Sequence, residues 1–200
     1  PGVEVNTIQF GWMVNPNLYG DKLTRTFASV TIGGNRCFNH LCSGFVQVNQ
    51  KLPLGYALKN ISIFGADKFA VRSIIFKDPK SGNWWLAHDD VEQTVGYWPN
   101  SLFPSLSSSA SEITWGGGVY SANSNEANPP MGSGHFANED NKKAAYFKFL
   151  RIIDESNNIT FPQDNLLQYF TDSPKCYTIG ELKGAGHAFQ YGGPGGNCGK

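Results

Sequence analysis

Hydrophobic positions along this chain fall into short runs that favour strands over helices. Residues 71–76 are β-branched and aromatic, and residues 45–49 alternate in part between apolar and polar side chains. The apolar and aromatic residues from 145 to 153 predict one long strand. Apolar residues at helical spacing are hard to find, so the pattern predicts a chain built mainly of strands.

Turn-forming residues separate these runs. Asn, Asp, Pro and Gly gather at residues 15–17, 78–83, 128–130 and 192–196, and the serine-rich stretch 105–111 is predicted to be a further loop. With 23 Gly and 11 Pro, many short strands joined by turns predict an all-β antiparallel sandwich or barrel. The sequence has no linker rich in Pro or Ser and no internal repeat, so we expect residues 1–200 to form a single domain.

The charge balance excludes some classes of partner. Sixteen basic residues match sixteen acidic ones, and no Lys/Arg run could neutralise a phosphate backbone, so nucleic acid is not an expected partner. No stretch approaches the ~20 apolar residues of a membrane-spanning helix, so we expect no membrane partner. The first residues do not form a signal peptide, and we expect a soluble, already processed mature chain.

The four cysteines predict two local disulfides, Cys37 with Cys42 and Cys176 with Cys198. Four cysteines allow three connectivities, and the sequence alone does not choose among them. Zinc binding by all four is the rival interpretation, but the spacing of Cys176 and Cys198 lies far outside that of zinc ligands. Glycosylation sequons, which begin at Asn60 and Asn158, agree with a secretory route.

Metal and nucleophile chemistry has little support in the sequence. Ser133 lacks the spacing of a nucleophile turn, and the glycine runs at 116–118 and 192–196 are not followed by the helix start of a phosphate loop. We therefore expect no metal and no cofactor. The histidines are too scattered for a local metal site, and they are His40, His88, His135 and His187.

Seven blocks along nearly the whole chain, the first made of two overlapping ranges, resemble one protein family. The blocks are residues 8–12, 11–21, 37–47, 77–85, 96–99, 115–119, 131–136 and 191–198. In these blocks the chain resembles neprosin, the plant prolyl endopeptidase of the glutamic peptidases. The resemblance implies a plant protein of the secretory pathway, extracellular or vacuolar, synthesised with a propeptide that is absent here. It also implies an antiparallel β-sandwich of two packed sheets and both disulfides.

The two acids of that family are missing. Residues 8–12 and 115–119 resemble the two active-site strands, in which the family has Glu where this chain has Gln9 and Gly118. A carboxylate can gain and lose a proton near the working pH, whereas an amide or a glycine cannot. Fungal glutamic peptidases use a Gln with a single Glu, so the loss of catalysis rests on Gly118, which has no side chain.

Neighbouring acids are poor substitutes for the missing pair. If residues 112–119 form one unbulged strand, Glu112 shares a face with Gly118 but stands roughly 20 Å from that site at the strand rise. Glu4 is five residues from Gln9 and therefore points to the opposite face.

The sequence therefore predicts a neutral, widened cleft that binds without cutting. Gln9 keeps two donors and an acceptor, and aromatic rings beside amides bind sugars and proline-rich peptides. The partner expected is thus a glycan or a proline-rich peptide, while most other tryptophans are expected to fill the core. The expected binding residues are Gln9, Trp12, Trp115, Gly116, Gly117 and Gly118.

Three functions remain open at this point. The favoured one is a secreted plant pseudo-peptidase with a lectin-like or defence-related binding role. The second is an active glutamic endopeptidase that cleaves after Pro at acid pH with an unaligned carboxylate. The third is a storage or structural protein.

Overall fold

A computed structural model describes residues 5–88, 93–121, 126–139, 143–184 and 187–198. Their contacts group the chain into two compact units. The N-terminal unit comprises residues 1–62 and 68–113, and the C-terminal unit comprises residues 63–67 and 114–200. That residues 1–200 form a single domain stays a prediction.

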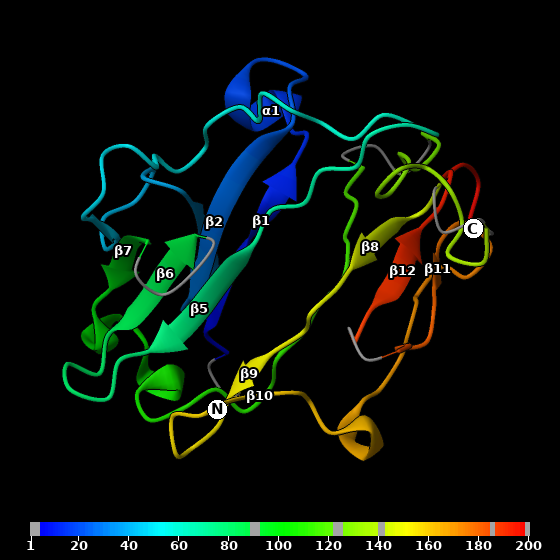
Figure 1. Ribbon diagram of the computed structural model, residues 1–200. Coiled ribbons are helices and arrows are strands. Elements are labelled where there is room, and N and C mark those ends of the chain that lie inside the picture. Colours follow the sequence, from blue (N-terminus) through cyan, green and yellow to red (C-terminus); the bar gives the residue numbers. More distant parts are fainter. Residues whose placement is uncertain (1–4, 89–92, 122–125, 140–142, 185–186, 199–200) are drawn as a thin grey trace. The chain divides into compact units, whose positions relative to one another are not determined.

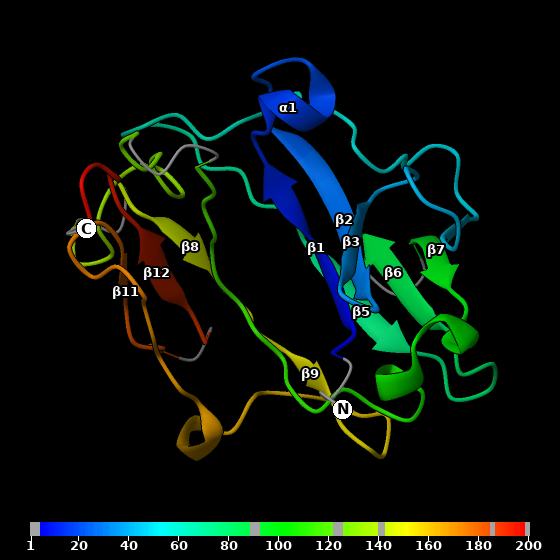
Figure 2. The ribbon, with the colours of Figure 1, turned by 180° about the vertical axis from the view of Figure 1, so that it is seen from behind.

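The N-terminal unit contains two antiparallel sheets (Figures 1 and 2). The first sheet has the order β1-β2-β3 and consists of β1 (Thr7–Met13), β2 (Arg25–Ile32) and β3 (Asn35–Phe38). The second sheet has the order β4-β7-β6-β5 and consists of β4 (Val46–Gln47), β7 (Thr94–Trp98), β6 (Trp84–His88) and β5 (Ser73–Lys77).

Local sequence explains the connections in this unit. Helix α1 (Pro16–Tyr19) is a single turn, with the Asn15 side chain accepting from the N–H of Leu18 and Gly20 in the left-handed region after it. Strands β2 and β3 are joined by Gly33 and Gly34 at φ 56° and 77°. Two positive φ angles suit a tight hairpin turn, and glycine adopts them without strain.

The core of the N-terminal unit lies between its two sheets. Ala28 of β2 packs with Trp84 and Leu86 of β6, and Ile8 and Phe10 of β1 lie against this cluster. Two 3₁₀ turns, η1 (Asn100–Leu102) and η2 (Pro104–Leu106), flank Phe103, which is fully buried in the same core. Two antiparallel sheets with an apolar layer between them form a β-sandwich, which confirms the predicted all-β fold.

The C-terminal unit is built from shorter strands. Its core contains Leu150, Phe189 and Tyr191, with Trp115 and Met131 packed against them. One sheet has the order β11-β12-β8, and a two-stranded hairpin and the 3₁₀ turn η3 (Asp164–Leu166) complete the regular structure. The strands are β8 (Ala145–Phe147), β9 (Ile152–Ile153), β10 (Ile159–Thr160), β11 (Thr178–Ile179) and β12 (Phe189–Gly192).

The prediction of one long strand from 145 to 153 was wrong. The segment forms two strands that pair with different partners, β8 with β12 and β9 with β10. Between them Phe149 has φ 57°, in the left-handed region, and this conformation ends the pleat. Leu150 is buried beside the break, so the chain turns to place an apolar side chain in the core. The other runs were located correctly but differ in length, as β5 and β4 show.

Both predicted disulfides are present. Cys37 pairs with Cys42 across a separation of 5 residues in the N-terminal unit, and Cys176 pairs with Cys198 across 22 residues in the C-terminal unit. Cys176 is 2% exposed and lies two residues before β11, which pairs with β12. Each disulfide thus ties a loop to the unit that contains it.

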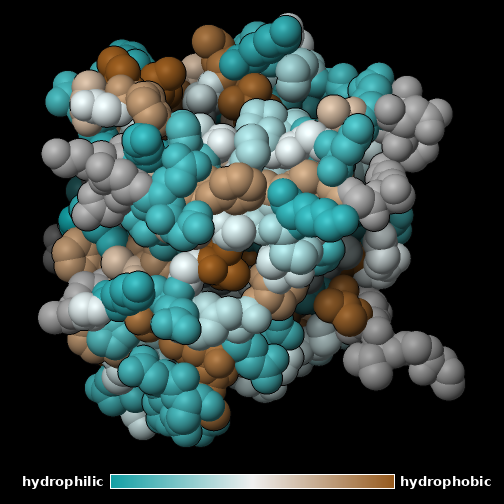
Figure 3. Space-filling view, turned by 90° about the vertical axis from the view of Figure 1, so that its right-hand side faces the viewer, coloured by the Kyte–Doolittle hydropathy of each residue, from teal (hydrophilic) through white to brown (hydrophobic). Residues whose placement is uncertain are grey.

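The described surface is mixed in polarity. Hydrophobic residues on the face in Figure 3 form small areas separated by hydrophilic ones. Within the described ranges, no helix combines the length and the apolar character that crossing a membrane requires.

Disulfide removal should destabilise the protein unequally. The entropy of closing loops of 5 and 22 residues corresponds to about 2.1 and about 3.4 kcal/mol. We predict that Cys176→Ser with Cys198→Ser lowers the free energy of unfolding by about 1 kcal/mol more than Cys37→Ser with Cys42→Ser. Urea unfolding of the two double variants measures the difference. Hydrogen exchange with and without reductant should show the C-terminal segment opening first, and the reverse order would contradict the prediction.

Candidate functional site

Gln9 lies on the face of its sheet that points away from the sandwich core. Side chains alternate along β1, and Ile8 and Phe10 pack into the core, so Gln9 is directed to the other face. The register between β1 and β2 is unbroken and places Gln9 opposite Ser29. In the next pair of strands, Arg36 lies opposite Thr31, two residues along β2 from Ser29. Gln9, Ser29 and Arg36 therefore share one face.

These three side chains form a connected polar cluster, which we call the Gln9–Ser29–Arg36 cluster. Oε1 of Gln9 accepts hydrogen bonds from Nη2 of Arg36 and from Oγ of Ser29, the latter at 3.2 Å. Nη2 of Arg36 also lies 3.4 Å from Oγ of Ser29. Ser29 is only 2% exposed, whereas Gln9 and Arg36 are exposed. Ser29 thus forms the buried base of a cluster whose other two members face solvent.

Aromatic rings border the cluster on the same face. The Arg36 guanidinium lies 4.9 Å from the centre of the Phe38 ring, and Phe38 is 6.2 Å from Phe27. A Cβ at Gly11 would come within 3.2 Å of the Phe27 ring. The cation is therefore held between hydrogen-bond acceptors and an aromatic face, a favourable setting for a guanidinium.

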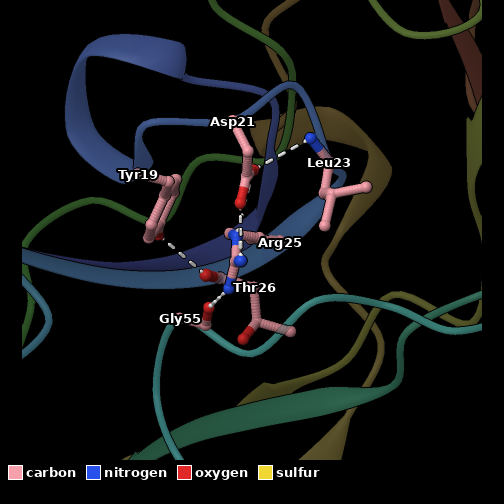
Figure 4. A network of polar contacts seen from close by, with 6 residues as sticks. All are labelled: Tyr19, Asp21, Leu23, Arg25, Thr26 and Gly55. Atoms are coloured by element: carbon pink, nitrogen blue, oxygen red, sulfur yellow. Dashed lines mark hydrogen bonds and ion pairs between the residues drawn. The ribbon is translucent and has the colours of Figure 1, made fainter.

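Arg25 occupies the same face but is neutralised by an acid (Figure 4). Its Nη2 lies 2.7 Å from Oδ2 of Asp21, and its Nη1 donates to the carbonyl of Gly55 at 2.9 Å. The hydrogen bond from Arg25, assisted by one from the N–H of Leu23, lowers the pKa of Asp21. By contrast, no carboxylate among the described residues pairs with Arg36.

Sequence reasoning missed Ser29 and Arg36. A signal was present, because Gly33 and Gly34 separate a β-branched run from residues 35–38 and predict a two-residue hairpin. In a hairpin whose turn is Gly33 and Gly34, the next residue pair outward from the first one joins Thr31 with Arg36. The pairing of β1 with β2, which brings Gln9 to Ser29, has no comparable local signal.

The structure separates Trp12 from Gln9. They are three residues apart on an unbulged strand and therefore lie on opposite faces of β1. Trp12 is 40% exposed, as expected for a residue outside the core. Trp84 and Trp98 are buried in the N-terminal core, whereas Trp85 is half-buried.

Residues 115–118 belong to the C-terminal unit and are not part of a strand. The expected distance of roughly 20 Å between Glu112 and Gly118 assumed such a strand. Residues 112–121 have no regular secondary structure, because a glycine run offers few side chains to pack against a neighbouring strand. Glu112 is exposed in this segment, so its distance from Gly118 cannot be taken from strand geometry. Glu4 lies outside the described residues.

The three glycines of this segment differ in what surrounds them. A Cβ at Gly117 would lie 2.6 Å from the Tyr191 ring and 2.8 Å from Sδ of Met131, so this position faces the C-terminal core. At Gly116 and Gly118 a Cβ would meet no atom within 4 Å. Trp115 is half-buried and packs against the same core as Gly117. Position 118 is therefore open to a Cβ, whereas position 117 is not.

The histidines lie in separate environments. Nδ1 of His135 is 2.9 Å from Oε2 of Glu139, and this hydrogen bond is the main cause of the lowered pKa of Glu139. His187 stacks on Phe161 with ring centres 3.9 Å apart. Within the described ranges, no three His, Cys, Asp or Glu residues lie close enough to hold a metal ion.

The contrast between Gly117 and Gly118 is testable with matched alanine variants. We predict that Gly117→Ala lowers the free energy of unfolding by about 1–3 kcal/mol, because its Cβ would overpack the core. Gly118→Ala should leave stability unchanged or raise it by up to about 1 kcal/mol, since its surroundings are open and the unfolded chain loses entropy. Urea unfolding of both variants decides, and equal effects would contradict the placement of the two glycines.

The comparison with protein families agrees with these observations. The Neprosin family model matches residues 2–194 of the 200-residue chain. This range includes β1 with Gln9, the Trp115–Val119 segment and every disulfide-forming cysteine except Cys198. A match over nearly the whole chain shows that this protein belongs to the Neprosin family.

Proposed function

We propose that this chain is a non-catalytic binding member of the Neprosin family, a pseudo-peptidase. The observation that carries the proposal is the chemistry at positions 9 and 118. Gln9 cannot take a proton from water, and its Oε1 is engaged by Arg36 and Ser29. Gly118 has no side chain at all. Neither position can perform the proton transfer that acid peptide hydrolysis requires.

Other carboxylates support the proposal because they have structural partners. Asp21 is paired with Arg25, and Asp78 accepts from the hydroxyl and the N–H of Ser81 in the turn between β5 and β6. Glu139 is paired with His135. The hydrogen bonds lower the pKa of all three acids, which makes each a weaker base for taking a proton from water.

The proposed ligand is a glycan or a proline-rich peptide. The Gln9 face offers a side-chain amide beside a cation and two phenyl rings, whereas Trp12 does not belong to this face. Amides orient hydroxyl and carbonyl groups, while aromatic rings pack on sugar and proline rings. A lectin-like or defence-related role is consistent with such a surface.

A secretory route and a plant origin are part of the same proposal. Two disulfides are typical of proteins that fold in oxidising compartments. The sequon residues Asn60 and Asn158 are both exposed, as glycosylation requires. Extracellular or vacuolar destinations both fit these features.

Catalysis is the first test of the proposal. The wild-type chain should show no turnover of a proline-containing reporter peptide from pH 2 to 6. We predict that Gln9→Glu with Gly118→Glu gains at least trace cleavage after Pro, because the direction of a side chain at 118 is open. Gln9→Glu alone is the control and should stay inactive.

Turnover by the wild type would overturn the proposal in favour of an active endopeptidase with an unaligned carboxylate. A double variant that folds and stays inert would show that the peptide-binding surface has changed, and would remove proline-rich peptides from the proposed ligands.

Ligand binding is the second test. The purified chain should bind members of a glycan array or a proline-rich peptide series, and calorimetry then measures the affinity. Gln9→Ala should weaken that binding by about tenfold, the loss of roughly one hydrogen bond to a ligand. If the chain binds no glycan and no peptide in these two assays, a binding role is contradicted and a storage or structural protein is favoured.

A further inference from the structure

We infer that Arg36 makes the Gln9–Ser29–Arg36 cluster a carboxylate-binding site, and that its ligand is an acidic oligosaccharide containing a uronate. The inference rests on the proposed binding function and names the ligand class that the N-terminal unit recognises. Neither Ser29 nor Arg36 belongs to the acid pair of the family's catalytic pattern.

The charge on Arg36 is not neutralised by the described residues around it. Its partners are the amide oxygen of Gln9, the hydroxyl of Ser29 and the ring of Phe38, all of them uncharged. A guanidinium stays protonated at every physiological pH. Arg25, on the same face, shows the alternative, because Asp21 supplies the missing carboxylate there. At Arg36 a ligand can supply that carboxylate.

The cluster is also held in place before any ligand arrives. Ser29 is 2% exposed and fixed on the central strand of the sheet, and its hydroxyl lies within hydrogen-bond distance of both Gln9 and Arg36. With Oε1 of Gln9 engaged, the group that this side chain has left for a ligand is its Nε2 donor. Gln9 and Arg36 together therefore present donors, and a carboxylate presents acceptors.

Geometry favours a sugar acid over a peptide. The three side chains come from three neighbouring strands and lie on the face of the sheet. A peptide that binds by strand addition needs a sheet edge, which this face does not provide, and a proline-rich segment has no side-chain carboxylate for Arg36. A uronate combines one carboxylate for one guanidinium with hydroxyl oxygens for the Gln9 donor. Its single negative charge matches the single cation of the cluster.

The experiment uses the full chain and trigalacturonic acid, with its methyl ester as the uncharged counterpart. Calorimetry should show that the chain binds the acid at least tenfold more tightly than the ester, because the ester cannot form charge-assisted hydrogen bonds. Added salt should weaken binding of the acid and leave binding of the ester unchanged. Arg36→Gln should weaken binding of the acid by about 10- to 100-fold. Arg72→Gln removes the same charge from an exposed position before β5 and should change nothing.

A second variant separates ligand binding from folding. Gln9→Glu places a carboxylate within reach of Arg36. This carboxylate should pair with Arg36 and so prevent binding of the acid, while the sheet stays intact. Circular dichroism and urea unfolding confirm that both variants fold. Loss of binding in both, with native stability, supports the inference.

Other outcomes would overturn it. Equal binding of acid and ester, or binding that is unaffected by Arg36→Gln, would remove the carboxylate site and leave the proposed binding function in place. Arg36-dependent binding of a peptide with a free C-terminal carboxylate, but not of trigalacturonic acid, would overturn the assignment to a sugar acid. Failure of every glycan and peptide would remove the binding function itself.

Discussion

The N-terminal unit depends on the strict alternation of side chains along β1. Ile8 and Phe10 pack into the core, and the unbroken register with β2 then directs Gln9 to the opposite face, above Ser29. A slip of one residue would expose two apolar side chains and bury an amide without partners. Burial of the core residues thus sets both the stability of the sandwich and the position of the polar cluster.

The same constraint limits the cluster's chemistry. Because the core takes the apolar side chains of β1 and β2, the other face receives the polar ones, and two arginines share it. Arg25 is paired with an acid in its own hairpin region, whereas Arg36 meets only neutral groups. Gln9 gives Arg36 an amide oxygen but no negative charge, so the charge of Arg36 is not neutralised by the described residues around it.

In the C-terminal unit, packing assigns different roles to adjacent glycines. Gly117 is confined by Tyr191 and Met131, so any larger residue at this position would press on the packed side chains of the core. At Gly118 a Cβ would meet no atom within 4 Å. The described surroundings of position 118 therefore leave room for a Cβ, whereas those of position 117 do not.

Much of the architecture could be predicted from local patterns. The β-branched runs and the glycine and proline turns indicated an all-β chain, because strand propensity and turn chemistry act locally, whereas the four cysteines left three pairings open until the structure chose one. The same logic failed at residues 145–153, where Phe149 adopts a left-handed conformation so that Leu150 can enter the core. Residues 112–119, for which the family resemblance implied a strand, have no regular secondary structure.

The sequence by itself shows that neither position 9 nor position 118 carries an acid. Only the tertiary structure decided which side chains surround Gln9. The meeting of Gln9 with Ser29 and Arg36 depends on strand register between segments 20 and more residues apart. Such contacts are set by burial of the whole core, which no local pattern of residues contains.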